Sequence, residues 1–553
     1  MTQKITQVSQ SHHSFTFASV GSIRALITSI LFLSYPLALF AQNVVSLKVT
    51  EFGAKGDGVT LNTIAIQKAI DAVSKEGGTV LFPPGRYLTG SLYLRSNVSI
   101  YLDVGATILG SGNLNDYQSH IPKLRSYNDS FLRYSLFYSE GEKNISIMGQ
   151  GVIDGQGGLF KVKSKSKPDR YENRPFVIRF VKCSSVKVEG IRLRNSAMWM
   201  QQYLACDDLT IRGISVFNHA NQNNDMMDID GCKNVIISGC YGDTDDDGIV
   251  LKSTSEYPDE NIIVTNCVLS SHCNAIKLGT ESMGGFKDIN IADIVVKPSN
   301  VNSVIFGYPE GISGISITEV DGGVLNGVNI SHIVMDGPQV PIFIRLGDMG
   351  RKYDRSENRP EVGKLENVTI RNVLATNIKS IGCSIIGLPG HPVNNVSLSG
   401  INIVFDGGVG KDEASEFPQE LRDHYPESTM WGKLPAYGFF VHHAKDISFD
   451  NVHLTFRKED SRPVLYCRDV NGLNIAGLTA DVSGDADAFI ELSKVSDAVV
   501  QSCRPIGATM NFIHVDGLVK RLSILSNDAR SAKRLFYPSN GKEIRAEGNL
   551  LNK

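Results

Sequence analysis

The chain has 553 residues, with 55 Lys and Arg against 58 Asp and Glu, which gives a formal net charge of −3. This slightly acidic balance argues against non-specific binding to nucleic acid, which needs a basic surface. Hydrophobic residues make up 42% of the chain, enough for a large core, and its 52 glycines predict frequent turns.

The first 41 residues have the layout of a secretory signal peptide. Arg24 precedes an apolar run over residues 25–40, and Ala41 is a small residue at the expected cleavage position. A membrane anchor is the alternative, but the run of about 16 residues is shorter than the ~20 that a span needs. We therefore predict a leader, residues 1–41, and one domain, residues 42–553, that is secreted or periplasmic and has no membrane span.

A short amphipathic helix is predicted near the beginning of that domain, over Thr63–Ser74. Its apolar residues recur at helical spacing; they are Ile64, Ile66, Ala69, Ile70 and Val73. A repeat protein needs a cap over its open end. We interpret the helix as that cap for the repeats that follow.

The strongest periodic pattern is a strand motif: apolar, any, apolar, any, then usually Gly, Asn or Asp, then apolar. Copies begin at Val186, Leu209, Val235, Ile262 and Ile289, and again at Val328, Val368, Val396, Ile447 and Leu473. Alternation with period two, rich in Val, Ile and Thr, predicts strands. A unit of 26 or 27 residues cannot bury its own apolar face, so the units must stack in register. The pattern predicts an all-β fold, a three-sheet parallel β-helix, with a β-sandwich as the alternative.

Nine cysteines are scattered along the chain. Export would permit disulfides, but the odd number leaves at least one thiol unpaired within the chain. Cys240 and Cys267 occupy the repeat position that Ile214 and Ile294 fill in adjacent copies. We interpret these two as small buried hydrophobes, with a disulfide between stacked coils as the alternative.

Two aspartate-rich segments lie about one coil apart. Residues 223–228 read Asn-Asn-Asp-Met-Met-Asp, and residues 243–248 read Asp-Thr-Asp-Asp-Asp-Gly. They resemble the Asn-Thr-Asp-Gly-x-Asp and Gly-Asp-Asp motifs of the polygalacturonases, glycoside hydrolase family 28, with Asp245 in place of the glycine. Residues 51–58 and 77–87 are similar to the opening of many pectin-acting β-helix proteins. The resemblance spans roughly residues 48–480 and implies a right-handed, pectin-lyase-like β-helix that degrades cell-wall pectin.

Glycoside hydrolysis needs one carboxylic acid that protonates the leaving oxygen and a second carboxylate that activates water or attacks. Inverting enzymes hold the two ~6.5–9.5 Å apart, which carboxylates on adjacent coils, stacked ~4.8 Å apart and offset sideways, can reach. We expect Asp246 to be the general acid, and Asp225 and Asp247 to place the water. A solvated turn or a Ca²⁺ site is the alternative for the acidic run.

Further polar residues are expected on the same outer face. Asp228 and Asp230 alternate with Met227 and Ile229 and are assigned a supporting role. Substrate-binding candidates are Asn223, Lys252, Lys277 and Arg345. The two lysines lie 25 positions apart, and each alternates with buried residues on its strand. They are therefore expected to stack on one outer face beside the carboxylates and to hold a sugar carboxylate. Neutralising the acids is the alternative role for them.

Two departures from the family pattern bear on specificity. Residues 273–281 align with the family's Gly-His-Gly-x-x-Ile-Gly-Ser-Glu segment, which places Asn274 at the histidine; His272, two residues earlier, is the alternative replacement. The family's Arg-Ile-Lys motif falls near Ser316–Thr318, where both basic residues are missing. In the family these residues serve a galacturonate next to the cleaved bond. We therefore expect homogalacturonan to be a poor substrate, and rhamnogalacturonan, a branched pectin or another uronate-bearing glycan to be preferred.

The longest insertion between repeats runs from about Asp406 to Tyr437. Its candidate sugar-contacting residues are Phe417, His424, Tyr425 and Trp431. Long loops over a rigid scaffold often carry binding function. The alternative is a small core of its own, packed on the coil.

Together these features predict an inverting glycoside hydrolase that acts, as a monomer, on a pectic polysaccharide or oligosaccharide. No organic cofactor or metal is implied. A β-helix polysaccharide lyase with Lys252 or Lys277 as base and Ca²⁺ as cofactor is one alternative. A non-catalytic glycan-binding β-helix is the other.

Overall fold

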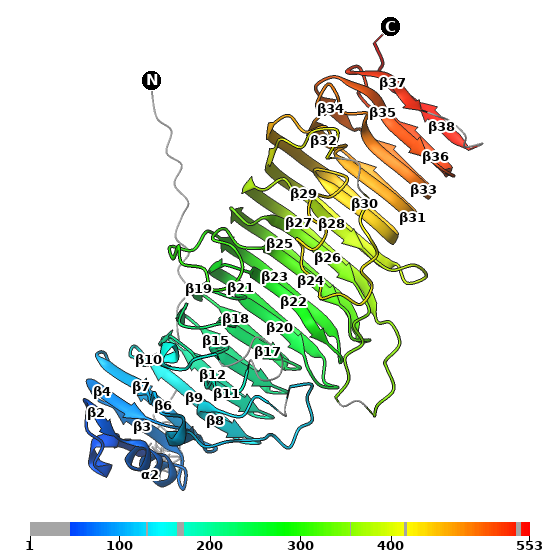
Figure 1. Ribbon diagram of the computed structural model, residues 1–553. Helices are drawn as coiled ribbons and strands as arrows, with labels where there is room; N and C mark the ends of the chain where they lie inside the picture. Colours follow the sequence, from blue (N-terminus) through cyan, green and yellow to red (C-terminus); the bar gives the residue numbers. More distant parts are fainter. Residues whose placement is uncertain are drawn as a thin grey trace, which may run out of the picture. The chain divides into compact units, whose positions relative to one another are not determined.

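Strands of successive coils stack in parallel along the whole chain from β1 (Val45–Lys48) to β38 (Ile544–Glu547) (Figure 1). This computed structural model describes residues 45–128, 131–162, 171–353, 356–413, 417–537 and 543–552. The predicted leader, residues 1–41, lies outside the described residues. No helix in the described part of the chain is long and apolar enough to cross a membrane.

The strands form three parallel sheets, with one strand of each coil in each sheet. The first sheet contains β9 (Lys143–Gly149), β12 (Ser184–Glu189), β15 (Asp207–Arg212), β18 (Lys233–Ser238), the first half of β21 (Asp259–Ser271), β23 (Phe286–Val296), β25 (Val324–Asp336), β27 (Lys364–Ile378), β29 (Val393–Gly407), the later part of β30 (Phe439–Lys458), and parts of β31 (Leu465–Ala476) and β33 (Ala488–Gln501). The second sheet contains β7 (Ala106–Gly110), β10 (Val152–Asp154), β13 (Arg192–Arg194), β16 (Ser215–Asn218) and β19 (Tyr241–Thr244). It continues through the second halves of β21, β23, β25, β27 and β29, which therefore belong to both sheets.

The third sheet, which we call the site sheet, carries the predicted functional residues on its strands and in the turns that precede them. It contains β8 (Ser135–Glu140), β11 (Phe176–Val181), β14 (Gln201–Leu204), β17 (Met227–Asp230), β20 (Ile249–Ser253), β22 (Asn274–Ser282), β24 (Ser313–Glu319), β26 (Val340–Leu346), β28 (Cys383–Ile386) and the beginning of β30.

The predicted register is confirmed in every copy of the strand motif. Leu209 pairs with both Val186 and Val235, and Ile262 pairs with both Val235 and Ile289. The pairing continues through the later copies, Val328, Val368, Val396, Ile447 and Leu473. The β-sandwich is therefore excluded.

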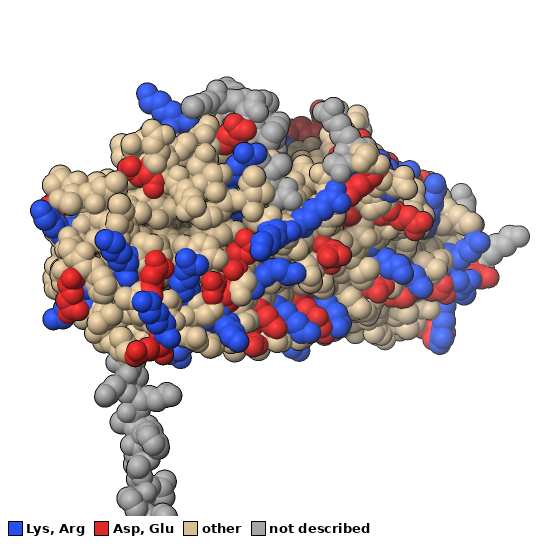
Figure 2. All heavy atoms as spheres, turned by 90° about the horizontal axis from the view of Figure 1, so that it is seen from below, with Lys and Arg blue, Asp and Glu red and all other residues tan. Residues whose placement is uncertain are grey.

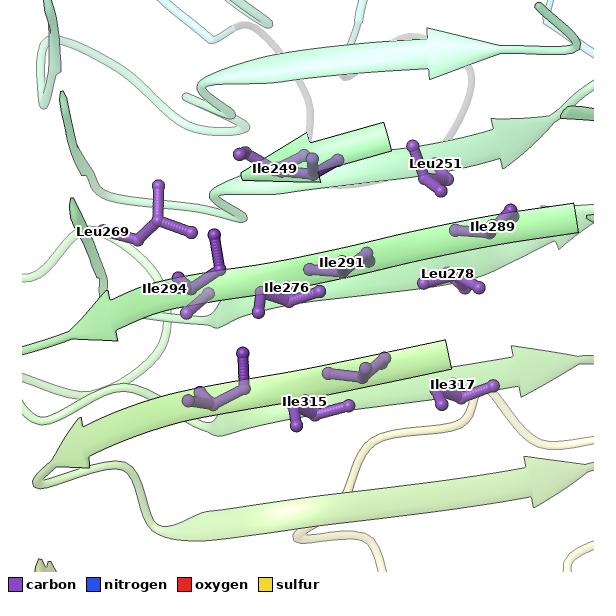
Figure 3. Packing of buried hydrophobic residues seen from close by; sticks show 14 of the residues in the cluster. Ile249, Leu251, Leu269, Ile276, Leu278, Ile289, Ile291, Ile294, Ile315 and Ile317 are labelled. Atoms are coloured by element: carbon purple, nitrogen blue, oxygen red, sulfur yellow. The ribbon is translucent and has the colours of Figure 1, made fainter. Parts of the chain in front are cut away.

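The core fills the space between the three sheets. Figure 3 shows Ile249, Ile276 and Ile315 of the site sheet stacked one above another, with Leu251, Leu278 and Ile317 beside them. Ile289 and Ile291 lie on the facing first sheet. Each such side chain is worth roughly 1.5–3 kcal/mol when fully buried. The stacked rows make a stiff scaffold for residues on the opposite face of the same strands.

The N-terminal end of the coil is covered by a helix, as predicted. Helix α2 (Thr63–Val73) lies at that end in Figure 1 and buries Ile66, Ala69, Ile70 and Val73. Ile64, expected on the same apolar face, is 74% exposed.

All nine cysteines are buried and free, as the repeat position predicts for Cys240 and Cys267. Cys267 pairs with Ile294 of the next coil. None of the nine cysteines forms a disulfide bond.

Charged residues on the outside alternate in sign. Figure 2 shows basic and acidic side chains interspersed over the face in view. On the first sheet, Glu260 lies 3.6 Å from the Lys233 ammonium and 3.1 Å from that of Lys287. Exposed pairs of this kind contribute little stability, ~0–1 kcal/mol each, so the core holds the coil together.

Candidate active site

A cavity of about 220 Å³ lies over strands β17, β20 and β22 of the site sheet. It gathers acidic, basic and aromatic side chains from distant parts of the chain. Its lining residues are Tyr171, Trp199, Asn223, Asp225, Asp246, Asp247, Lys252, Lys277, Glu281, Phe306, Tyr425 and Glu427. The three predicted catalytic aspartates therefore share one cavity.

Two tight turns, just before β17 and β20, aim the aspartates at this cavity. Asn223 adopts a left-handed conformation with φ of 56°, which asparagine tolerates well. The Asn218 side chain donates a 3.0 Å hydrogen bond to the carbonyl oxygen of Asp225, and the Thr244 hydroxyl donates one of 2.8 Å to that of Asp246. Short polar side chains thus fix the backbone of both turns.

Asp247 is the most strongly paired of the three aspartates. Its Oδ2 accepts a 2.7 Å hydrogen bond from the Lys277 ammonium, and its Oδ1 accepts bonds from the backbone and side-chain nitrogens of Asn274, at 3.1 and 2.7 Å. Burial alone would raise the pKa of Asp247, but Lys277 and then Lys252 outweigh burial and lower it. Asp247 is therefore ionised.

Asp246 has weaker partners. Its Oδ2 accepts a 3.3 Å bond from the Asn223 amide, and its Oδ1 accepts a 3.0 Å bond from the backbone nitrogen of Asp247. Burial, followed by the negative charge of Asp247, raises the pKa of Asp246 to about 6. Two neighbouring carboxyl groups with separated pKa values are what acid and base roles require.

Asp225 shares the Lys252 ammonium with two other acids. The Lys252 Nζ lies 3.9 Å from Asp225, 3.4 Å from Asp228 and 3.4 Å from Glu281, and it sits 4.7 Å from the centre of the Trp199 ring. Burial, with the charge of Asp228, raises the pKa of Asp225 well above its usual range, and burial raises that of Asp228 to about 8. Burial opposes the charge of Lys252, but Glu281 and Asp228 outweigh it and raise the lysine pKa.

The two lysines lie on the same outer face, as predicted, but they do not stack on each other. Lys277 pairs with Val250, whereas Lys252 pairs with Asp230. The coil from Val250 to Lys277 is 27 residues long, so a spacing of 25 leaves the lysines two positions out of register. The expectation of direct stacking was wrong. Both ammonium groups contact the acid cluster, the alternative role that the sequence left open.

Asp228 and Asp230 face outward from β17, opposite the core residues Met227 and Ile229, yet both are fully buried. Asp230 accepts bonds from the backbone nitrogen of Thr254 at 2.8 Å, from its hydroxyl at 2.7 Å and from the Gln202 amide at 2.9 Å. Asp230 therefore holds the turn after β20 rather than lining the cavity.

His272 and Arg345, both substrate-binding candidates, lie outside the cavity lining. His272 is buried against Asp245 and the carbonyl oxygen of Val301. The Arg345 guanidinium donates to the carbonyl oxygens of Gly387 at 3.1 Å and Glu420 at 2.6 Å. Arg345 thus fastens the long insertion to the coil. Asn274, at the position of the family histidine, contacts Asp247.

One part of the insertion reaches the cavity and another part packs on the coil. Tyr425 reaches the cavity, where its hydroxyl accepts a 3.3 Å bond from Lys277. Phe417 and Trp431 pack instead on the site sheet beside Phe440, and His424 is exposed. Glu427 also lines the cavity, and burial raises its pKa to about 7.

Several lining residues were missed by sequence reasoning. They are Tyr171, Trp199, Glu281, Phe306 and Glu427. Glu281 ends the segment that aligns with the family's Gly-Ser-Glu, so its position was available as a signal. The others come from loops whose path over the coil no periodic pattern encodes.

Comparisons with known sequences match a family of glycoside hydrolases. The family model described as glycosyl hydrolases family 28 matches residues 105–421. A probable polygalacturonase from Vitis vinifera is 29% identical over 381 residues, 65% of this chain and 74% of that protein. An exo-poly-alpha-D-galacturonosidase from Dickeya chrysanthemi is 28% identical over 312 residues, 46% of this chain and 51% of that protein, so this chain spans about half of its length.

Solved structures share the fold. A hyperthermoactive exopolygalacturonase from Thermotoga maritima superposes with a TM-score of 0.54 at 20% identity, covering 73% of this chain and 92% of that one. A family 28 exopolygalacturonase from Yersinia enterocolitica gives 0.55 at 19% identity, covering 86% and 78%. The fold is a right-handed parallel β-helix. Because the family match covers more than half of its length, the chain belongs to glycosyl hydrolases family 28 and is a glycoside hydrolase.

Proposed function

We propose that this enzyme hydrolyses a galacturonate-containing, rhamnogalacturonan-like pectic polysaccharide with inversion of configuration, and that it acts as a monomer. The observation that carries the proposal is the single cavity in which Asp225, Asp246 and Asp247 meet two lysines and several aromatic rings. Relatives named as polygalacturonases support a pectic substrate.

In this proposal Asp246 protonates the leaving oxygen. Its carboxyl group lies in the cavity, and no lysine of the described ranges donates a hydrogen bond to it as Lys277 does to Asp247. Asp247, kept ionised by Lys277 and oriented by Asn274, takes the proton from the attacking water. Asp225, on the preceding coil, completes the water site. The acid and the base are therefore consecutive residues on one turn, and the water that inversion requires would lie between Asp247 and Asp225 of the preceding coil.

Substrate binding is assigned to residues around these carboxyl groups. Lys252 and Lys277 supply positive charge, and Asn223 supplies an amide beside Asp246. Trp199 and Tyr425 offer ring faces on which a sugar can stack. His272 and Arg345 are not assigned this role, because their polar atoms bond to the scaffold.

Both lysines are poor candidates for the base of a lyase. A base must be uncharged to accept a proton, whereas surrounding carboxylates raise the pKa of Lys252 and of Lys277 despite their burial. The absence of Arg and Lys at Ser316–Thr318 supports a preference for rhamnogalacturonan or branched pectin over homogalacturonan.

We also infer that the enzyme acts outside the cytoplasm, secreted or periplasmic, as one catalytic domain over residues 42–553. The charged flank, apolar run and small residue of the first 41 positions support export. Mass spectrometry of the chain purified from culture medium or periplasm tests this, since a retained Met1 would contradict cleavage.

The function is tested by incubating the enzyme with defined rhamnogalacturonan, branched pectic and homogalacturonan oligosaccharides. We expect new reducing ends, fastest on the first two, with the anomer of the product opposite to that of the substrate by NMR. Products that carry an ultraviolet-absorbing double bond, and that no longer form when chelator is added, would show a lyase instead. Binding with no new reducing end on any substrate would show a non-catalytic protein.

A further inference from the structure

Behind the cavity lies a second cluster of polar residues that the proposed chemistry does not use. His219 follows β16, Asp245 precedes β20 and His272 precedes β22, so three segments on neighbouring coils converge there. One ring nitrogen of each histidine and one carboxylate oxygen of Asp245 lie within 4.8 Å of one another. The cluster includes Asp245, which replaces the glycine of the family motif, and His272.

The contacts of His272 fix the role of one of its ring nitrogens. Its Nε2 lies 3.0 Å from the carbonyl oxygen of Val301, which can only accept, so Nε2 carries a hydrogen. Its Nδ1 lies 2.9 Å from Oδ1 of Asp245. A neutral-ring Nδ1 and a carboxylate oxygen are both acceptors, so either a proton or a bridging cation must lie between them.

His219 is oriented in the same way. Its Nε2 lies 2.9 Å from the Asp243 carboxylate, which also accepts a 2.6 Å bond from the Ser299 hydroxyl, so Nε2 is the donor. Its Nδ1 lies 3.9 Å from Oδ1 of Asp245. The side chain is only 5% exposed, and this nitrogen is buried without a hydrogen-bond partner among the described residues. An unpaired buried acceptor of this kind is costly, ~1–3 kcal/mol.

We propose that His219 Nδ1, His272 Nδ1 and the Asp245 carboxylate bind a Zn²⁺ ion. Imidazole nitrogens and a carboxylate are ligands that Zn²⁺ accepts in proteins. Histidines that bind a metal almost always donate their other ring N–H to a carboxylate or a backbone carbonyl. Both histidines do so here, through Asp243 and Val301.

The ion would fix one wall of the cavity. The Asp245 carboxylate also accepts 2.9 Å bonds from the backbone nitrogens of Ile305 and Phe306, and Phe306 lines the cavity. A cation bound to Asp245 would therefore tie the loop after β23 to the turn that carries Asp246. This role accounts for an aspartate at the glycine position of the motif.

A second histidine cluster, Glu420, His442 and His443, differs from the first by a fixed positive charge beside it. The neighbouring coil places Arg468 directly beside His442 in register, and a fixed positive charge opposes a second cation. It therefore serves as an internal comparison.

The test is metal binding by the full chain, produced without a histidine tag and stripped with chelator. We expect one Zn²⁺ per chain by calorimetry and elemental analysis, a higher melting temperature with Zn²⁺, and a visible absorption band when Co²⁺ replaces it. His219→Phe and His272→Phe, which keep a ring in place, should each weaken binding by more than about 100-fold. Asp243→Asn, which alters the partner of a ligand, should weaken it by ~10–100-fold.

His453→Gln is the matched control, because His453 is exposed on β30. It should bind Zn²⁺ as the unaltered chain does, and circular dichroism checks the fold of each variant. If the unaltered chain binds no Zn²⁺ or Co²⁺ at micromolar concentration, the proposal is overturned whatever the variants do. Binding within about threefold of normal in folded His219→Phe would overturn it equally.

Discussion

Asp246→Asn isolates the proton-donating step that the proposed mechanism assigns to this residue. The asparagine has nearly the same shape, and its Oδ1 can still accept the 3.0 Å bond from the backbone nitrogen of Asp247. What it loses is the acidic proton. A positioned general acid contributes typically ~10²–10⁴-fold in rate, which corresponds to about 2.7–5.5 kcal/mol of activation free energy.

The structure also predicts a stability cost for this variant. The new amide nitrogen would face the Asn223 amide across the present 3.3 Å contact, donor against donor. Asn223 cannot turn over without losing the 3.0 Å bond that its Oδ1 accepts from Arg174. One mismatched buried pair costs about 1–3 kcal/mol. This is small for a core of this size, so the variant should fold.

The assay is turnover of a pectic oligosaccharide that the unaltered enzyme cleaves, with circular dichroism and urea unfolding as folding controls. Asp293→Asn is the matched substitution, since Asp293 is exposed on β23 with φ of 59°, which asparagine also adopts. It should keep full activity. A folded Asp246→Asn enzyme that retains more than about half of the activity would refute the assignment of general acid.

Three other perturbations test the site. The first concerns Asn274: the unaltered enzyme should cleave homogalacturonan at least about tenfold more slowly than branched pectin, and equal initial rates would show that the missing histidine has no consequence. The second is Lys277→Met, which leaves Asp247 buried without its 2.7 Å partner and should lower the free energy of unfolding in urea by about 3–5 kcal/mol. Adding Asp247→Asn should recover part of this loss. A Lys277→Met variant as stable as the parent would show that the Lys277–Asp247 ion pair does not stabilise the fold. The third is Asp228→Asn. The folded pKa of Asp228 is about 8, above its unfolded value, so the folded state holds more protons and its stability falls as pH rises from about 4 to about 8. Over that pH window the free energy of unfolding should fall on the order of a few kcal/mol less in the variant than in the unaltered protein. If the two proteins show parallel curves of unfolding free energy against pH, the raised pKa is contradicted.

The fold could be predicted from sequence because its information is local and repeated. Each coil carries the same alternation, and a strand that slips by one residue would turn its whole apolar face to solvent. Val186 to Leu473 therefore stack as the pattern requires. The end cap was predictable for the same reason, since Thr63–Val73 has a helical period within one short segment.

The site was only partly predictable, because its information is divided between local motifs and long-range contacts. The aspartate motifs place Asp225, Asp246 and Asp247 directly on adjacent turns. The partners of these carboxylates depend on register, and Lys277 lies beside Val250 rather than Lys252 because one coil has 27 residues. Glu427 reaches the cavity only through the path of the insertion, which no repeat constrains.

The strand register also relates the missing Arg-Ile-Lys motif to the position of Lys277. Lys277 pairs directly with Ser316, the position near which the family's first basic residue would fall. Both stand in one row on the outer face of the site sheet, so this chain carries its cation one coil earlier, ~4.8 Å along the axis. In that position the Lys277 ammonium donates a hydrogen bond to Asp247. A uronate bound next to the cleaved bond would find Ser316 and Thr318 buried and uncharged. The cations in register with these two residues, Lys277 and Arg345, already bond to Asp247 and to backbone carbonyl oxygens. We therefore expect the position of the charges to disfavour homogalacturonan, whether or not Asn274 can replace a histidine.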